Sequence, residues 1–414
     1  MSFYIKDLLQ LSTGVRRFLV SEAFYGIGIG LYTLVLNLHL LFRGLREDEI
    51  GALVSMGILI MGVLAIPVSL LANRTGRKKL LVTGVFFIAA GNVLFAVSDE
   101  LLWFYAAQIL VSAGLTLVET TEIQLLFHYC RSRKEEARAF SLMFAVFTAF
   151  TGLGTLAAGY ISKGFEGSRG YEVSLLLTGL VLVLHGVIRA FWLPAENKAS
   201  AAAAAAAASP SRGISRLMGP LSSGTLWLFA VFTALLGGCI AMTGSFLNVI
   251  VKFRLDWMDD QVSLILAIGA ILLFICSLMT PYVMERFGYN TAIISVFIVN
   301  ILLFAALYMI LPVWLFIGLF LLRGGGVTML SNLLDSLLMS AFNEKERNLY
   351  AGMRSVFRSL GSSGATFVAG LILARQDYRL PFLATAGVLL LCGLYYVWWI
   401  RPALSKRINS GIEP

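Results

Sequence analysis

The ionisable residues that lie inside long apolar runs are the positions at which this sequence can do chemistry. They are Glu22, Glu119, Glu122, Asp335, Arg323, Arg354 and Arg358. An ionised group at the centre of a membrane-spanning helix costs about 2.5–3.5 kcal/mol on insertion scales, so such residues face a cavity or a partner and mark ion or proton pathways. A carboxylate in this setting can carry a proton, and an arginine can bind an anionic group.

Glu119 and Glu122 are three residues apart, which places both on one face of a helix. Gln108, Ser112 and Thr116 extend this polar face. Two carboxylates this close in a medium of low dielectric do not both ionise easily, so we expect one of them to bind a proton. The alternative is a static salt bridge to an arginine of a neighbouring helix.

Glu22 begins a second polar stripe, which continues to Asn37 at helical spacing and has Tyr25 beside it. We interpret Glu22 as a protonatable carboxylate on a face that lines a cavity. Tyr25 and Asn37 are candidates for substrate contact on that face. The alternative is a carboxylate near the lipid headgroups that pairs with Arg16 or Arg17.

Arg354 and Arg358 are one helical turn apart and repel each other on a shared face, so an anion must be near. The candidates are Asp335, Glu22, the paired carboxylates around residue 120, or an anionic group of a substrate. The same position also suits a cytoplasmic gate. We therefore keep both interpretations, substrate binding and gating, for the two arginines.

Arg323 lies near the middle of its apolar run and is interpreted as a substrate or coupling residue, with a structural hydrogen-bonded arginine as the alternative. Asp335 lies nearer the predicted cytoplasmic end and is a candidate for proton coupling or a gate partner. Arg189 ends the sixth run and is expected to extend its side chain to the interface. Acidic residues thus gather in the first half and basic residues in the second, which suits a zwitterionic substrate or salt bridges between the halves.

The composition of the chain fits a membrane protein. It has 414 residues, of which 58% are hydrophobic and 13% are charged. The charged share is about half that of a soluble protein, which excludes a soluble globular enzyme and a disordered chain. A spanning helix needs about 20 apolar residues. Twelve runs qualify, at residues 18–42, 50–72, 80–98, 101–128, 139–162, 171–193, 224–251, 261–284, 291–310, 313–340, 349–374 and 380–400.

Basic residues are distributed unevenly between the two sets of predicted loops. The side opposite the termini holds only Arg43, Arg46, Lys163, Arg169, Lys252, Arg254, Arg375 and Arg379. Because cytoplasmic loops carry an excess of Lys and Arg, we predict that both termini are cytoplasmic. The net charge of +9 is then a sign of topology rather than of nucleic-acid binding. We expect an integral plasma membrane protein, as in a bacterial inner membrane.

A long polar interruption divides the chain into two halves. The predicted parts are an N-terminal six-helix bundle (1–193), a cytoplasmic linker (194–223) with the alanine tract Ala201–Ala208, a C-terminal six-helix bundle (224–401) and a cytoplasmic tail (402–414). Gly76 and Gly288 lie in corresponding loops of the two halves, 212 residues apart. Repeated halves are typical of secondary transporters, whose substrate binds between them near the middle of the membrane.

The loop after the second run carries a motif. Its residues are Ser69, Asn73, Arg74, Gly76, Arg77 and Lys78. With the twelve runs, this loop resembles the major facilitator superfamily, whose pattern is Gly-x-x-x-Asp-Arg-x-Gly-Arg-Lys. The resemblance implies an all-α fold of two pseudo-symmetric bundles and a gating loop that latches them, made of Asn73, Arg74, Gly76 and Arg77. Asn73 replaces the aspartate of the family, and it can cap a helix but brings no charge.

We expect a secondary active transporter that moves a small amphipathic or zwitterionic solute by alternating access, with proton-coupled export by antiport as the favoured mode. The expected partners are this solute, protons and the lipid bilayer, and the chain is expected to be a monomer that binds no nucleic acid. A lipid or lysolipid transporter of the same fold is the alternative. A membrane-embedded enzyme is a remote alternative, because Glu119, Glu122 and His128 have no matching His or Cys partner.

The sequence indicates neither a metal site nor a cofactor. The cysteines have no shared spacing and lie at Cys130, Cys239, Cys276 and Cys392. This distribution favours buried, inert thiols over a metal site or a disulfide framework. The glycine-rich loop that binds nucleotide phosphates is missing from the sequence, so transport driven by ATP within this chain is unsupported.

Overall fold

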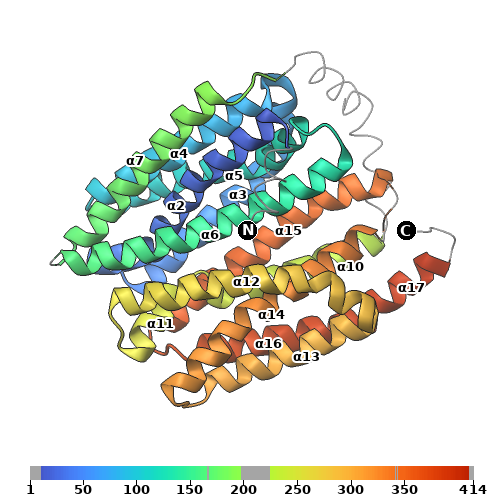
Figure 1. The fold of residues 1–414 in the computed structure, drawn as a ribbon. Helices are drawn as coiled ribbons and strands as arrows, with labels where there is room; N and C mark the ends of the chain where they lie inside the picture. The colour runs from blue at the N-terminus through green and yellow to red at the C-terminus, as the bar shows by residue number, and fades with distance from the viewer. Residues whose placement is uncertain (1–10, 166, 197–223, 341, 343, 410–414) are drawn as a thin grey trace, which may run out of the picture. The chain divides into compact units, whose positions relative to one another are not determined.

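The computed structural model describes residues 11–165, 167–196, 224–340, 342 and 344–409. These residues form helices with short connections and contain no strand (Figure 1). Twelve of the helices are long and apolar enough to cross a membrane. The prediction of an all-α membrane protein with twelve spanning helices is confirmed. The alanine tract Ala201–Ala208 lies outside the described residues.

One compact unit comprises residues 1–44, 63–209 and 258–271. Its complete helices are α2 (Thr13–Phe42), α4 (Arg77–Val97), α5 (Leu101–His128), α6 (Arg133–Gly164) and α7 (Arg169–Trp192). Helix α2 packs against α6 and α7, and α4 packs against α5 and α7 (Figure 1). Because α2 also contacts α5, side chains from α2, α5 and α7 can meet inside this unit.

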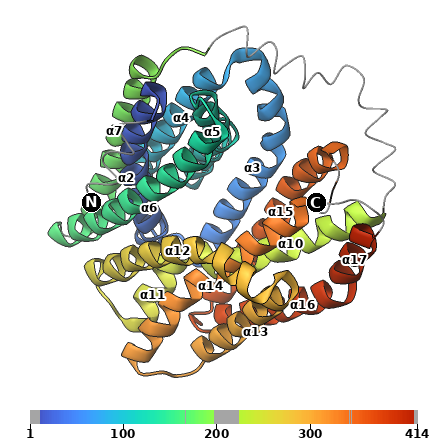
Figure 2. The ribbon, with the colours of Figure 1, turned by 45° about the vertical axis from the view of Figure 1, so that its right-hand side comes forward.

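The second compact unit comprises residues 45–62, 210–257 and 272–414. Its complete helices are α10 (Gly224–Gly244), α11 (Leu247–Leu255), α13 (Tyr289–Tyr308), α14 (Val313–Ser340), α15 (Glu344–Leu373), α16 (Leu380–Tyr395) and α17 (Arg401–Asn409). Helix α10 packs against α15 and α16, and α13 packs against α14 and α16 (Figure 2).

Two helix ends in the second unit differ from the predicted runs. A single span was predicted over residues 224–251, but α10 ends at Gly244 and α11 begins at Leu247. Gly244 and Ser245 are weak helix formers, which explains the break. At the other end, α16 continues through one π-helical turn, Tyr396–Ile400, into α17. The first residues of the predicted tail are therefore helical.

Helix α3 (Glu47–Thr75) is divided between the two units after Gly62. Its first part packs within the second unit, where the Ser363 hydroxyl donates a hydrogen bond of 2.8 Å to the Ser55 carbonyl oxygen. Pro67 lies inside the helix shortly after the division. A proline at this place has no N–H to donate to the helix and crowds the preceding turn.

Helix α12 (Asp259–Phe287) is divided in the reciprocal way, and its first part belongs to the first unit. The Lys163 ammonium donates to Asp260 at 2.6 Å, and the Tyr171 hydroxyl donates to Asp259 at 2.7 Å. These contacts attach the start of α12 to the ends of α6 and α7.

Glycines let the central helices of each unit approach closely. A Cβ atom on Gly154 of α6 would collide with the Ile27 carbonyl oxygen of α2. In the second unit, a Cβ atom on Gly361 of α15 would collide with the Ala234 carbonyl oxygen of α10. Small residues at helix interfaces are typical of membrane bundles, because packing there depends on close backbone contact.

The two glycines that are 212 residues apart have the same structural role. Gly76 precedes α4 with φ of 91°, and Gly288 precedes α13 with φ of 71°. This positive φ is strained for residues with a side chain, so glycine is required at both helix starts. The equivalence of the two loops at the level of the backbone supports the interpretation of the halves as repeats.

Candidate functional site

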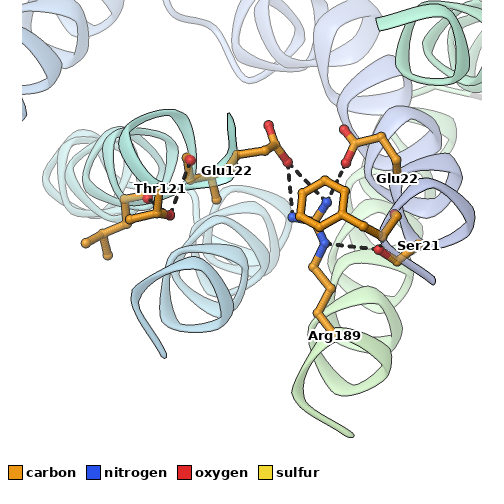
Figure 3. A network of polar contacts seen from close by, with 8 residues as sticks. Ser21, Glu22, Thr121, Glu122 and Arg189 are labelled. Carbon is orange, nitrogen blue, oxygen red and sulfur yellow. Dashed lines mark hydrogen bonds and ion pairs between the residues drawn. The ribbon is translucent and has the colours of Figure 1, made fainter. Parts of the chain in front are cut away.

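Arg189 of α7 is the centre of a buried polar network in the first unit (Figure 3). Its guanidinium forms an ion pair with Glu22 of α2 and donates to Glu122 of α5 at 3.1 Å. Its Nε donates to the Ser21 hydroxyl at 3.2 Å. The three helices that meet in this unit thus each contribute to one network.

Aromatic rings cover the network. The Arg189 guanidinium lies 4.5 Å from the centre of the Phe18 ring and 5.9 Å from that of Tyr25. Tyr25 in turn stacks on His185, with 5.6 Å between ring centres. Rings at these distances attract the cation through their π faces and keep water away from it. Arg189 and Glu22 are therefore shielded from water, and an unpaired charge there is expensive.

The sequence-based prediction for Arg189 is wrong. Its side chain is fully buried between helices and does not extend to the interface. The alternative partners proposed for Glu22 are also wrong, because Arg16 donates to Thr13 and Arg17 to the Trp192 carbonyl oxygen. One signal in the sequence pointed to Arg189: it is the single Lys or Arg residue inside the six predicted runs of the first half.

The two carboxylates of α5 have different surroundings. The Glu122 side chain is 13% exposed and contacts Arg189, whereas Glu119 is an exposed residue of the helix. Thr121, next to Glu122, is buried and donates to the Leu117 carbonyl oxygen at 2.6 Å. The structure thus joins Glu122 with Glu22 in one network.

The charges of this network do not balance. Glu22 and Glu122 are two carboxylates that share the single guanidinium of Arg189. With all three groups ionised the network has a net charge of −1, and one bound proton makes it neutral. A buried site in a membrane protein favours the neutral state, because an excess charge loses its hydration there.

The second unit contains a charged cluster with the opposite composition, in which two arginines share one carboxylate. Asp335 of α14 forms ion pairs with Arg354 and Arg358 of α15, at 3.5 Å for Arg358. Arg358 also donates to the Ser331 hydroxyl at 3.3 Å. The side chains of Asp335, Arg354 and Arg358 are 26%, 22% and 33% exposed, so water reaches this cluster. When all three groups are ionised its net charge is +1.

Arg323 lies apart from that cluster. Its side chain is buried, donates to the Thr243 hydroxyl at 3.2 Å and lies 4.7 Å from the centre of the Phe320 ring. Within the described part of the chain no carboxylate forms an ion pair with Arg323. These contacts match the structural alternative for this residue, and its role in substrate binding remains a prediction.

The remaining cavity candidates are Tyr25 and Asn37, both buried in α2. They belong to the first unit, whereas Arg323, Arg354 and Arg358 belong to the second. Each set has contacts within its own unit. The contact of these residues with a common substrate remains a prediction.

A carboxylate from another part of the chain contacts the predicted gating loop. The Asn73 side chain lies outside the described part of the structure, and Arg74 is exposed. Arg77 donates to the Gln124 side chain at 3.0 Å. Glu196, which follows α7, accepts a hydrogen bond of 3.2 Å from the backbone N–H of Lys78 in the first turn of α4. Glu196 thus brings to this helix N-terminus the negative charge that Asn73 lacks.

The described residues contain no group of three or more His, Cys, Asp and Glu side chains that could hold a metal ion. All four cysteines, which are within the described ranges, are free thiols.

Twelve helices that are long and apolar enough to cross a membrane define an integral multi-pass membrane protein. The family model of the Major Facilitator Superfamily matches residues 18–366 and 260–413. The chain therefore belongs to this superfamily of secondary transporters, and the resemblance seen in the loop after the second run is confirmed. No curated protein matches the sequence.

Solved structures of transporters share the fold. The nucleoside transporter NupG is 13% identical with a TM-score of 0.75, and the match covers 92% of this chain and 98% of NupG. A bacterial homologue of the iron transporter ferroportin is 15% identical with a TM-score of 0.71, over 93% and 98%. A proton-dependent oligopeptide transporter is 13% identical with a TM-score of 0.73, over 95% and 99%. Identities this low establish a common fold only.

Proposed function

We propose that this chain is a proton-coupled secondary transporter, and that the network of Glu22, Arg189 and Glu122 binds the proton. The observation that carries the proposal is the sharing of one buried guanidinium by two carboxylates. Of the two carboxylates, only one is neutralised by Arg189. The other is neutralised by a proton or by a second cation that enters the site.

This competition supports antiport. A protonated network is neutral and offers no charge to a cationic group, whereas a deprotonated network has an excess negative charge that such a group can neutralise. Proton and substrate cation would then bind in alternation, which is the requirement for exchange across a membrane. With an inward proton gradient, this exchange exports the solute.

The second unit supports a solute that also has an anionic group. The cluster of Asp335, Arg354 and Arg358 has an excess positive charge and is open to water. Arginine is well suited to bind carboxylate and phosphate groups, because its donors match their geometry. A small zwitterionic or amphipathic solute fits the opposite charge excess of the two units.

The distribution of basic residues supports an orientation. We place both termini in the cytoplasm and the protein in the plasma membrane, because the loops on the side of the termini hold most Lys and Arg residues. The chain would act as a monomer, since each unit contains its own charged network.

The test is a proton-flux assay with purified protein in liposomes that contain a trapped pH dye. Pools of amphipathic cations, zwitterions, lysolipids, sugars and organic acids are added to the outside. We expect one pool to move protons with the wild-type protein. Glu22→Gln and Glu122→Gln should abolish this signal. Glu119→Gln is the matched control, because it removes an exposed carboxylate from the same helix and should preserve the signal.

A second measurement separates loss of coupling from loss of folding. Each variant leaves a network as neutral as the protonated one, so exchange of labelled solute without a pH gradient should be lost together with proton flux, whereas thermal unfolding of the purified variants in detergent should stay close to that of the wild-type protein. Proton flux at the wild-type rate in both variants would refute the network as the proton site. Loss of flux in Glu119→Gln alone would assign the proton to Glu119 instead.

A further inference from the structure

A recess in the second unit is separate from both charged networks. It has a volume of about 690 Å³ and lies where the end of α11 meets the α13–α14 and α15–α16 connections. In the predicted topology this is the side of the membrane opposite the termini. Its lining includes two arginines, Arg254 and Arg379, and an apolar wall of Phe253, Tyr308, Met309 and Ile310.

Arg254 is held in place by uncharged partners. Its Nη2 donates to the Met309 carbonyl oxygen at 3.0 Å, and its guanidinium lies 4.4 Å from the centre of the Phe316 ring and 5.2 Å from that of Phe382. Its Nη1 is buried without a hydrogen-bond partner among the described residues. Burial, with a smaller effect of nearby Arg379, lowers the pKa of Arg254 to about 10, so the side chain remains charged at neutral pH.

Neither arginine of the recess has a carboxylate partner in an ion pair within the described ranges. Asp377 also lines the recess, but its Oδ1 accepts the backbone N–H groups of Arg379 and Leu380 at 2.9 Å each. This carboxylate thus caps the start of α16. The recess therefore combines two guanidinium groups with one carboxylate that is already engaged by the backbone.

Two basic residues on the same predicted side of the first unit differ from the arginines of the recess, because each has a carboxylate partner. Arg43 forms ion pairs with Asp99 and Glu172, and Lys163 pairs with Asp260. Loops on this side of the membrane carry few basic residues. Arg43 and Lys163 are thus neutralised within the protein, whereas Arg254 and Arg379 lie in a recess with positive charge in excess. An anion from outside the chain would neutralise them.

The apolar wall restricts the class of anion. Met309 and Ile310 are exposed hydrophobic residues, and Trp314, the second residue of α14, is also exposed. Phe253 stacks on Tyr378 with 5.4 Å between ring centres, which closes the other side of the recess. Exposed Trp residues near helix ends are typical of the membrane interface. A ligand at this depth has an apolar part beside its anionic group.

We propose that this recess binds the phosphate group of an amphipathic molecule. Arg254 and Arg379 contact the phosphate oxygens, and the wall around Ile310 contacts the apolar part. Guanidinium groups suit phosphate because they present several donors in a fixed plane. The phosphate belongs either to a bilayer phospholipid or to a water-soluble phosphate ester. The proposal does not depend on the proton-coupled function, because it uses none of the residues of the two charged networks.

The test measures displacement of a phosphatidylglycerol with a fluorescent tail from the purified protein in detergent. The competitors are dioleoyl phosphatidylglycerol, dioleoylglycerol, which has the same tails without phosphate, and glycerol 3-phosphate. We expect the first to displace the probe and dioleoylglycerol to require at least about tenfold more, because charge-assisted hydrogen bonds are lost. Displacement by glycerol 3-phosphate at similar concentration would identify a soluble ester, and its failure would identify a phospholipid.

Variants of the recess complete the test. Arg254→Gln and Arg379→Gln should each weaken binding of the probe by about tenfold, because each removes charge-assisted hydrogen bonds. Arg379 is exposed, so its variant should fold normally even if loss of the Arg254 contacts destabilises the protein. Arg375→Gln removes an exposed charge from the same connection outside the recess and is the matched control. An absence of saturable binding, equal displacement by dioleoylglycerol, or an equal loss in Arg375→Gln would overturn the proposal.

Discussion

The two units contain charged clusters that are opposite in composition and different in their exposure to water. In the first unit two carboxylates share one guanidinium, and in the second two guanidinium groups share one carboxylate. Glu122 and Asp335 are 213 residues apart, close to the spacing of the repeated loops, so the carboxylates of α5 and α14 occupy related positions.

The difference in burial assigns different tasks to the two clusters. Arg189 is fully buried beneath aromatic rings, so any charge imbalance around it must be removed by a proton or a bound cation. The cluster of Asp335 is partly hydrated, so its excess charge is tolerated and its ion pairs can exchange partners with water or a ligand. In the proposed function, related positions would thus serve proton binding in the first unit and ligand binding in the second.

The largest expected effect comes from Arg189→Gln. This change leaves Glu22 and Glu122 buried without a cation, and we expect it to lower the free energy of unfolding by about 3–5 kcal/mol. The measurement is chemical unfolding of the purified protein in detergent. Arg169→Gln, at an exposed position, is the control and should have little effect. A loss no larger than that of the control would show that water reaches the network.

Substitution of the close-packed glycines tests whether the units differ in packing as well as in charge. Gly154→Ala and Gly361→Ala each place a methyl group against a carbonyl oxygen of a neighbouring helix. We expect each to destabilise the protein by about 1–3 kcal/mol, because overpacking forces the helices apart. Thermal unfolding of both variants checks this. Unequal losses would indicate that the two bundles differ in rigidity.

A smaller effect is expected from Asp335→Asn. It removes the carboxylate that Arg354 and Arg358 share, but these side chains are partly exposed and water can solvate them. The expected loss is about 1 kcal/mol in the same unfolding measurement. A loss as large as that of Arg189→Gln would mean that the second cluster is as dry as the first, and the comparison would fail.

The smallest effect is expected at the start of α4. Glu196→Gln removes the negative charge from the helix N-terminus, and we expect a loss of about 0.3–1 kcal/mol that decreases with added salt. Unfolding at low and high ionic strength measures it. Glu285→Gln, at an exposed position in the last turn of α12, is the control. Equal losses in the two variants would show that the position of Glu196 at the helix start is unimportant.

Hydropathy and spacing were sufficient to predict the twelve spans and to place Glu22 and Glu122 inside them. They did not separate Glu122 from Glu119, because residues three apart differ in direction by about 60° around a helix, which can move one of them out of a contact. Arg189 was missed because a position near a helix end is also where arginines reach the interface. Glu196 was missed because its contact with α4 joins segments more than one hundred residues apart.

The proline in α3 has a mechanical consequence. The helix passes from the second unit to the first after Gly62. Pro67 has no N–H to donate to the preceding turn, so the backbone hydrogen bonds are weakened between Gly62 and Pro67. Sharp helix bends concentrate at prolines. The bending stiffness of α3 is therefore lowest close to the place where the helix leaves the second unit and enters the first. We therefore expect any bend of α3 to concentrate in the turn before Pro67, with the rest of the helix remaining straight.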